Sequence, residues 1–163
     1  GLTTPWGYYR GLGDRPDLLE IVWNHGFRFL RSFARNETDG QPVLLDWQPF
    51  SYACHGYADM VELLLHDYQD DFYWEAFSDH GPHETYADHM MGMVDKVVEE
   101  NLVWSAASHD HGTATEEGFK KKGDWYRAFL SYGLEKGVRF LTGAQFYREF
   151  LAQAARGERP CTP

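Results

Sequence analysis

The sequence predicts an α/β fold in which helices and short apolar strands alternate along the chain. Two observations lead to this prediction. Several segments carry apolar residues at the three-and-four spacing of an amphipathic helix, and apolar runs of strand length lie between them. Hydrophobic residues make up 43% of the chain, which is enough apolar mass to form a core. Because βα units of this kind usually build a largely parallel sheet or a barrel, we expect one domain over residues 1–163.

The first expected element is a helix over residues 14–26. Asp14 is expected to cap it, Pro16 falls in its first turn, and Gly26 ends it. Its apolar stripe consists of Leu18, Leu19, Val22 and Trp23.

The next segments change to the period of strands. A short strand comes first, and a polar loop follows it. The residues expected on one face of this strand are Phe27, Phe29 and Arg31. Residues 43–52 are aromatic but irregular, because Pro49 argues against a central strand at that point. Residues 60–66 (MVELLLH) fit a buried strand or a buried helix, and we favour the strand.

The second half of the chain repeats the alternation. Apolar spacing predicts helices over residues 83–101 and 124–136. Short apolar runs predict strands over residues 102–108 and 138–141. Thr142 is expected to cap a last amphipathic helix.

Charge and composition exclude several classes of function. Fifteen Lys and Arg residues against 25 Asp and Glu residues give a net charge of −10, which repels nucleic-acid phosphates and anionic membranes. No apolar window is long enough to span a membrane, and the first residues lack a signal-peptide pattern. Cys54 and Cys161 form neither a disulfide framework nor a metal-binding spacing. We therefore expect a cytoplasmic protein whose partners are neither nucleic acids nor membranes.

Three stretches could carry chemistry. The loop of residues 3–11 is dense in aromatic side chains beside one arginine, which suits sugar faces, although an ordinary packed loop can have the same composition. Asp46 beside Trp47 could orient a histidine while the indole lines a pocket, or could be a turn aspartate beside a core tryptophan. His109 and His111 follow a predicted strand and would face the same way, as metal ligands, as a general acid with a neighbour, or as structural side chains.

A fourth group of potential metal ligands lies near the start of a predicted helix. It consists of His80, His83, Glu84, Asp88 and His89. Gly81-Pro82 interrupts the helical face that would bring them together, so a solvated helix start is the favoured interpretation. A metal site formed by these residues and the HDH stretch stays an alternative.

The order of these stretches resembles a known family. TTPWGYYRGLGDRPDLLEIVWNHGFRFLRSF is followed by LDW, by LVWSAASHDHG and by GVRFLTGAQFYREFL. This order is similar to the second half of the polysaccharide deacetylase (NodB-like, carbohydrate esterase family four) fold, over nearly the whole chain. The resemblance implies the C-terminal half of a distorted (β/α) barrel.

The resemblance also implies a metal-dependent hydrolase of non-peptide C–N bonds, such as an enzyme that deacetylates N-acetylated sugars or polysaccharide. His109 corresponds to the general acid that protonates the leaving amine, and Asp46 to the carboxylate that raises its basicity. Thr3 occupies the place of the arginine in the family's third motif, for which Arg10 could substitute. The implied substrate-binding residues are Pro5, Trp6, Tyr8, Arg10 and Trp47.

Two motifs of that family, which supply the catalytic base and the metal ligands, do not occur in this sequence. We therefore assign no metal ligand here and expect a divalent metal, zinc in most members, to be held by residues upstream of Gly1. A barrel of this kind needs roughly 200 or more residues, so a missing N-terminal half or a second chain is expected to complete it. The alternatives are a small-molecule amidohydrolase of the same superfamily and a non-catalytic relative that binds carbohydrate or is structural.

Overall fold

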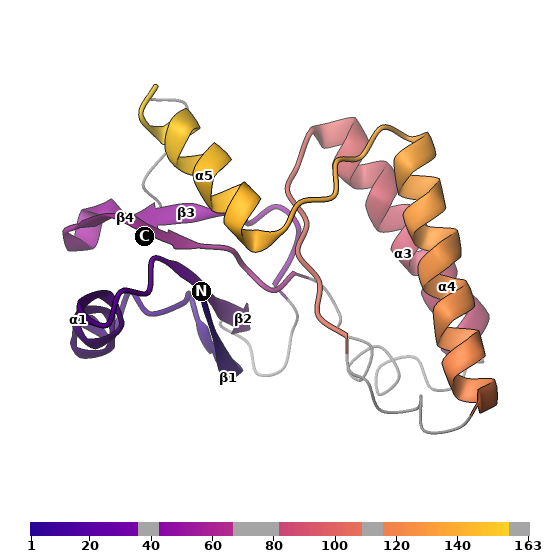
Figure 1. The fold of residues 1–163 in the computed structure, drawn as a ribbon, viewed down its shortest axis with the longest axis horizontal. Coiled ribbons are helices and arrows are strands. Elements are labelled where there is room, and N and C mark those ends of the chain that lie inside the picture. The colour runs from indigo at the N-terminus through magenta and orange to yellow at the C-terminus, as the bar shows by residue number, and fades with distance from the viewer. Residues whose placement is uncertain (36–42, 67–81, 109–115, 157–163) are drawn as a thin grey trace. The chain divides into compact units, whose positions relative to one another are not determined.

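The computed structural model describes residues 1–35, 43–66, 82–108 and 116–156 (Figure 1). The chain divides into two compact units. The first, here called the sheet unit, comprises Gly1–Asp67 and Leu141–Pro163, and the second, the helical unit, comprises Tyr68–Phe140. The expectation of one domain over the whole chain stays a prediction.

The sheet unit contains a four-stranded sheet with the strand order β1-β2-β4-β3. Its strands are β1 (Leu2–Tyr9), β2 (Phe29–Arg35), β3 (Phe50–Tyr52) and β4 (Tyr57–Glu62), with a 3-10 turn η1 (Ala53–His55) between the last two. β1 and β4 both pair with β2 in parallel, whereas β3 pairs with β4 antiparallel. The α/β prediction is confirmed, and the sheet is mixed.

Helix α1 (Pro16–Asn24) connects β1 to β2. Pro16 takes the first helical position as expected, because its fixed φ suits a helix start. The expected cap at Asp14 is wrong: Arg15 occupies the N-cap position, makes no side-chain cap bond, and pairs instead with Asp17. Gly26 follows the helix with a φ of +83°, in the left-handed region that glycine adopts without strain.

Strand β1 replaces the loop predicted for residues 3–11. Its pairing with β2 is irregular, because Thr3 lies opposite Arg31 while Tyr8 lies opposite Phe33. β1 therefore carries extra residues there, as in a β-bulge. This irregularity explains why a strand can contain Pro5 and Gly7, which are unusual in regular strands. Gly7 lies in this bulge with a φ of +65°, and a Cβ atom on it would come 2.3 Å from the Cβ of Ala34.

Residues 60–62 belong to the strand β4, which confirms the favoured interpretation for the start of residues 60–66. The chain continues beside β2 after Glu62, because Leu63 N and Leu65 N donate to the carbonyls of Leu30 and Phe33. The core of the sheet unit forms where β4 packs with Leu12, Leu19 and residues of β1, β2 and β3. The fully buried members of this core are Leu12, Leu19, Leu30, Phe33, Val43, Phe50, Tyr52, Met60 and Leu64.

Helix α5 (Gly143–Ala154) completes the sheet unit. Thr142 caps it as predicted: its hydroxyl accepts from Gln145 N, and the Gln145 side chain accepts from Thr142 N. Phe146 and Phe150 are buried, as the apolar spacing indicates. The Tyr147 hydroxyl donates to the Asp59 carbonyl at 2.8 Å and so joins α5 to β4.

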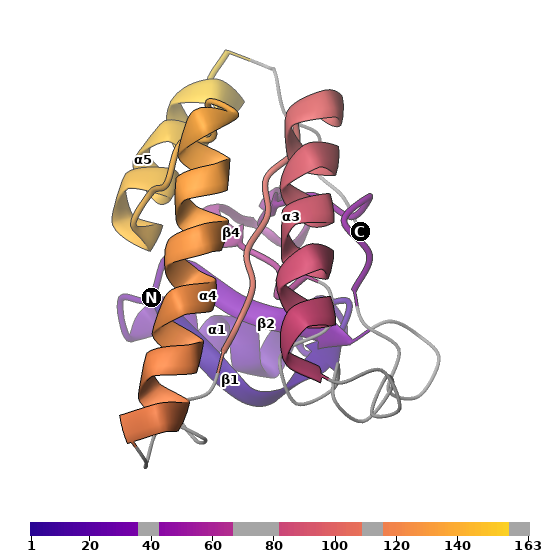
Figure 2. The ribbon, with the colours of Figure 1, turned by 90° about the vertical axis from the view of Figure 1, so that its right-hand side faces the viewer.

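The helical unit contains α3 (Pro82–Glu100) and α4 (Glu116–Glu135), which lie side by side (Figure 2). Tyr86 of α3 packs edge-on against Trp125 of α4. The strands predicted over residues 102–108 and 138–141 are wrong, since neither segment pairs with a strand in the described part of the chain. Trp104 of the first segment packs on helix α4 instead, edge-on to Phe129.

Helix α4 begins earlier than its apolar spacing indicates. Ion pairs one turn apart, Glu117 with Lys121 and Lys120 with Asp124, support the early turns. The lysines at 120–122 therefore lie within a helix. None of the helices in the described ranges has the length and apolar content needed to cross a membrane.

Candidate functional site

The parallel strands β1, β2 and the continuation of β4 end at one side of the sheet, here called the carboxyl edge. β1 ends at Tyr9, β2 at Arg35, and the continued β4 at His66, which forms a parallel bridge with Val43. Sites of open α/β sheets are usually built by the loops at this edge. The carboxyl edge is therefore the candidate functional site.

His66 fixes the predicted Asp46–Trp47 pair at the carboxyl edge. Its side chain is fully buried, and its Nε2 lies 2.7 Å from the Trp47 carbonyl oxygen. Because a carbonyl oxygen only accepts, the Nε2 must carry the proton. The Trp47 ring packs edge-on against Phe33 of β2, with 5.5 Å between the centroids. Asp46, next to this anchored tryptophan, is exposed to solvent at the carboxyl edge.

The end of β1 brings two further predicted residues to the same edge. Tyr8 is half-buried and packs against the sheet core. Arg10 has an exposed side chain and a φ of +54°, and Gly11 follows with a φ of +71°. Two successive left-handed residues turn the chain sharply, and for arginine this conformation costs roughly 1–2 kcal/mol. We call residues 10–12 the Arg10 turn.

A buried carboxylate lies beneath the Arg10 turn. Glu62 is completely inaccessible to solvent. Its Oε1 accepts from Ser32 N at 2.5 Å and Phe33 N at 2.9 Å, and its Oε2 accepts from Ser32 Oγ at 2.6 Å and the Tyr52 hydroxyl at 2.7 Å. The Tyr52 oxygen in turn accepts from Leu12 N at 2.9 Å. We call Glu62, Ser32, Tyr52 and the Leu12 amide the buried network.

A register change in the sheet explains why Glu62 accepts two backbone amides. Val61 N and Leu63 N donate to Arg28 O and Leu30 O, but Leu65 N donates to Phe33 O. β2 thus gains one residue relative to β4 at Ser32 and Phe33. The Glu62 carboxylate accepts from the two amides at that point, so that neither buried donor is left without an acceptor.

Burial dominates the electrostatics of the network. Burial raises the pKa of Glu62, although hydrogen bonds from Ser32, Phe33 and Tyr52 oppose the shift. Burial and the neighbouring Glu62 raise the pKa of the Tyr52 phenol, which therefore keeps its proton and donates it to Glu62. Burial lowers the pKa of Arg31, and attraction to Glu62 opposes this change.

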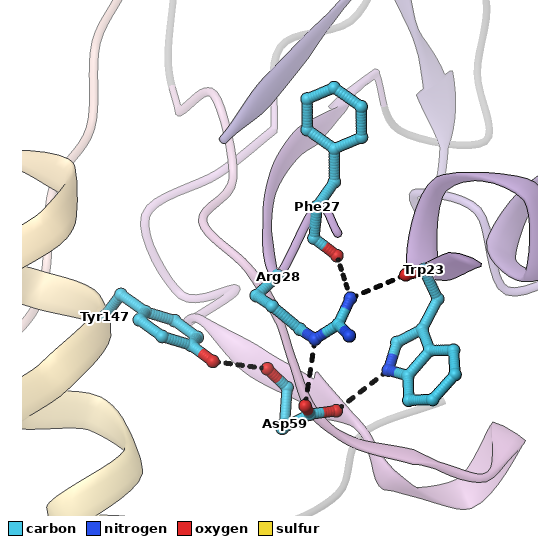
Figure 3. A network of polar contacts seen from close by, with 5 residues as sticks. All are labelled: Trp23, Phe27, Arg28, Asp59 and Tyr147. Carbon is cyan, nitrogen blue, oxygen red and sulfur yellow. Dashed lines mark hydrogen bonds and ion pairs between the residues drawn. The ribbon is translucent and has the colours of Figure 1, made fainter. Parts of the chain in front are cut away.

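A second polar network lies at the amino end of the strands (Figure 3). The Asp59 carboxylate accepts from Trp23 Nε1 and pairs with Arg28 Nε, both at 3.0 Å. The Arg28 guanidinium also donates to the carbonyls of Trp23 and Phe27 and lies over the Trp23 ring, 4.5 Å from its centroid. This network joins α1, β2, β4 and, through Tyr147, α5, and its position away from the carboxyl edge indicates a structural role.

The structure brings together some of the predicted site residues. Tyr8, Arg10, Asp46 and Trp47 all lie at or beside the carboxyl edge. Pro5 and Trp6 belong to β1, but their side chains are outside the described part of the structure. His109 lies outside the described residues altogether, as do His111 and His80, so the proposed partnership of Asp46 and His109 stays a prediction. Within the described ranges, no three or more His, Cys, Asp or Glu side chains group as a metal site would require.

Sequence reasoning missed Glu62, Tyr52 and His66. A detectable signal was present for Glu62, because an acid flanked on both sides by apolar residues of a buried strand must have several donors around it. The disulfide bond made by Cys54 was also not expected from the sequence. Such bonds are typical of oxidising compartments, and the expected cytoplasmic location stays a prediction.

No protein-family model, curated protein or solved structure matches the chain. The residues at the carboxyl edge and the order of the sequence motifs are therefore the basis of the proposed function.

Proposed function

We propose that this chain forms the general-acid side of a metal-dependent hydrolase of C–N bonds, such as a deacetylase of N-acetylated sugars or polysaccharide in the NodB-like superfamily. The observation that carries the proposal is the anchoring of Asp46–Trp47 at the carboxyl edge by the buried His66. An exposed carboxylate beside a rigid indole, at the site-forming edge of parallel strands, is suited to orienting a catalytic imidazole beside a sugar.

In the proposed reaction, His109 donates a proton to the departing nitrogen, and Asp46 raises the basicity of that imidazole. The backbone amide of Trp6 stabilises the oxyanion as a hydrogen-bond donor. Tyr8 and Trp47 pack against the sugar ring, and Arg10 binds polar groups of the substrate.

The metal would polarise the amide carbonyl and the attacking water. The described residues supply no set of three ligands, so we assign none within them and derive no further step through the metal. The proposal places the ligands and the catalytic base in another segment of polypeptide, either the missing half of the barrel or a second chain.

The test uses the natural polypeptide that carries this sequence, loaded with zinc and assayed for acetate release from acetylated chitooligosaccharides. We expect His109→Ala to lower kcat roughly 100-fold or more while zinc content is unchanged. His111→Ala, which removes the neighbouring imidazole, is the matched control and should leave kcat within about twofold.

Asp46→Asn supplies a second readout. Without the carboxylate, the general acid loses its proton more readily, so the falling limb of the kcat profile should move to lower pH. The proposal is wrong if the wild-type protein releases no acetate, or if His109→Ala retains full kcat. Hydrolysis of small cyclic or linear amides alone would identify the small-molecule amidohydrolase, and sugar binding without turnover would identify the non-catalytic relative.

A further inference from the structure

We infer that Tyr52 and Glu62 are positioning residues that hold the Arg10 turn, and with it the Arg10 side chain, in its substrate-binding arrangement. This inference rests on the proposed function, because it takes Arg10 as a substrate-binding residue. Neither residue touches the substrate: both act through the backbone of the turn.

The left-handed conformation of Arg10 must be held by contacts outside the residue itself. Left-handed φ angles are unfavourable for arginine and persist where the surrounding structure determines them. Two contacts of Leu12 hold the Arg10 turn in place. Leu12 has its side chain buried in the sheet core, and Leu12 N donates to the Tyr52 hydroxyl at 2.9 Å. The chain is thus fixed just after the two left-handed residues.

Gly11 packs directly on the buried network. A Cβ atom at this position would lie 2.5 Å from Tyr52 Oη, 3.2 Å from Glu62 Oε2 and 3.4 Å from Ser32 Oγ. The Arg10 turn therefore packs directly against the buried network. Any shift of the Tyr52 hydroxyl changes both this packing contact and the acceptor of the Leu12 amide.

Glu62 fixes the direction of the Tyr52 hydroxyl. A phenol has one proton to donate, and Tyr52 donates it to Glu62 Oε2 at 2.7 Å, because its other partner, the Leu12 amide, can only donate. A lone pair of the same oxygen is then left to accept from Leu12 N. Glu62 is itself held by the amides of Ser32 and Phe33. The backbone of the sheet thus fixes Glu62, Glu62 fixes the Tyr52 hydroxyl, and this hydroxyl fixes the Arg10 turn.

The experiment measures a double-mutant cycle between Tyr52 and Arg10 in the natural polypeptide. We expect Tyr52→Phe to raise KM roughly fivefold or more with kcat changed much less, since the turn moves but the reacting groups do not. We expect Arg10→Ala to raise KM as well. Combined with Arg10→Ala, Tyr52→Phe should raise KM little further, because a displaced turn matters only while Arg10 is present.

Ser32→Ala is the matched control. It removes one hydrogen bond from the same Glu62 oxygen at an equally buried position but leaves the Leu12 amide bonded to Tyr52. Tyr52→Phe removes two hydrogen bonds, one of them to the buried Leu12 amide, so we expect it to be less stable than Ser32→Ala. A purely structural role of the network would leave KM unchanged in both variants where they are folded, whereas we expect only Tyr52→Phe to raise KM.

Amide exchange gives a readout that does not depend on activity. Leu12 N–H should exchange at least about tenfold faster in Tyr52→Phe than in Ser32→Ala at matched stability. If Tyr52→Phe does not fold, Glu62→Gln replaces it, because the amide turns the Oε2 acceptor into a donor that faces the phenol. Unchanged Leu12 exchange, or additive effects on KM, would overturn the inference. Absence of any turnover would overturn the proposed function instead, while Leu12 exchange would still show whether Tyr52 holds the turn.

Discussion

Asp59 and Glu62 lie three positions apart on β4, and each is a carboxylate with several donors, yet their surroundings differ completely. Asp59 has a side chain that is 50% exposed, and its partners are the charged Arg28 and the Trp23 indole. Glu62 has no exposed surface, and the four groups that donate to it, the amides of Ser32 and Phe33 and the hydroxyls of Ser32 and Tyr52, are all neutral. Water can replace the partners of Asp59 but not those of Glu62, so burial decides how much each network contributes to stability.

The largest expected effect is that of Glu62→Ala. It leaves the amides of Ser32 and Phe33 and the hydroxyl of Tyr52 buried without their acceptor, which should lower the free energy of unfolding by about 3–5 kcal/mol. Urea denaturation measures this change. A loss below about 1 kcal/mol would mean that the surrounding donors find other acceptors, and the contrast with Asp59 would disappear.

The pH dependence of stability should be the intermediate effect. Burial raises the pKa of Glu62 from its ordinary value of 4.5, so the folded protein binds this proton more tightly than the unfolded chain does. The contribution of Glu62 to the free energy of unfolding should therefore fall as pH rises above 4.5 through the folded-state pKa.

Glu62→Gln cannot ionise and serves as the reference for that measurement. The unfolding free energy of the wild type minus that of Glu62→Gln should decrease as the pH rises above 4.5. An increase instead would show that the four donors outweigh burial and lower the pKa of Glu62 in the folded protein.

The smallest expected effect is that of Asp59→Ala, about 1 kcal/mol or less, because its ion pair with Arg28 is screened by solvent. The bond from Tyr147 survives this change, since it goes to the Asp59 backbone carbonyl. Added salt should reduce the difference between variant and wild type in urea denaturation. A loss as large as that of Glu62→Ala would show that exposure does not distinguish the two networks.

Periodic sequence patterns predicted the helices, because a helix buries one regular face, although they missed the start of α4. The run at residues 60–66 left helix and strand open, because every residue in it is buried and no period can be read. β1 was mistaken for a loop because its Pro5 and Gly7 are unusual in strands, and the bulge that accommodates them depends on β2. The apolar run at residues 102–108 has strand composition, but its Trp104 packs on helix α4. Composition alone cannot distinguish these two ways of burying the same side chains.

The candidate site could be predicted only in part. Asp46, Trp47, Tyr8 and Arg10 were indicated as candidates because their side chains suit a known chemistry. The buried Tyr52 and Glu62 were not, because their hydrogen-bond partners are distant in sequence: Leu12 lies 40 positions from Tyr52, and Ser32 lies 30 positions from Glu62. Such pairings become visible only once the sheet register is known.

The contact of Gly11 with Tyr52 has a consequence for how this sequence can vary. Two features exclude other side chains from position 11: its φ of +71°, and the Tyr52 phenol oxygen, which a Cβ atom would meet at 2.5 Å. Removing the phenol oxygen opens the space but leaves the φ requirement, so an alanine at position 11 becomes tolerable only together with a smaller residue at position 52. Among diverging copies of this gene, these two positions should therefore change as a pair, with glycine lost only after the tyrosine.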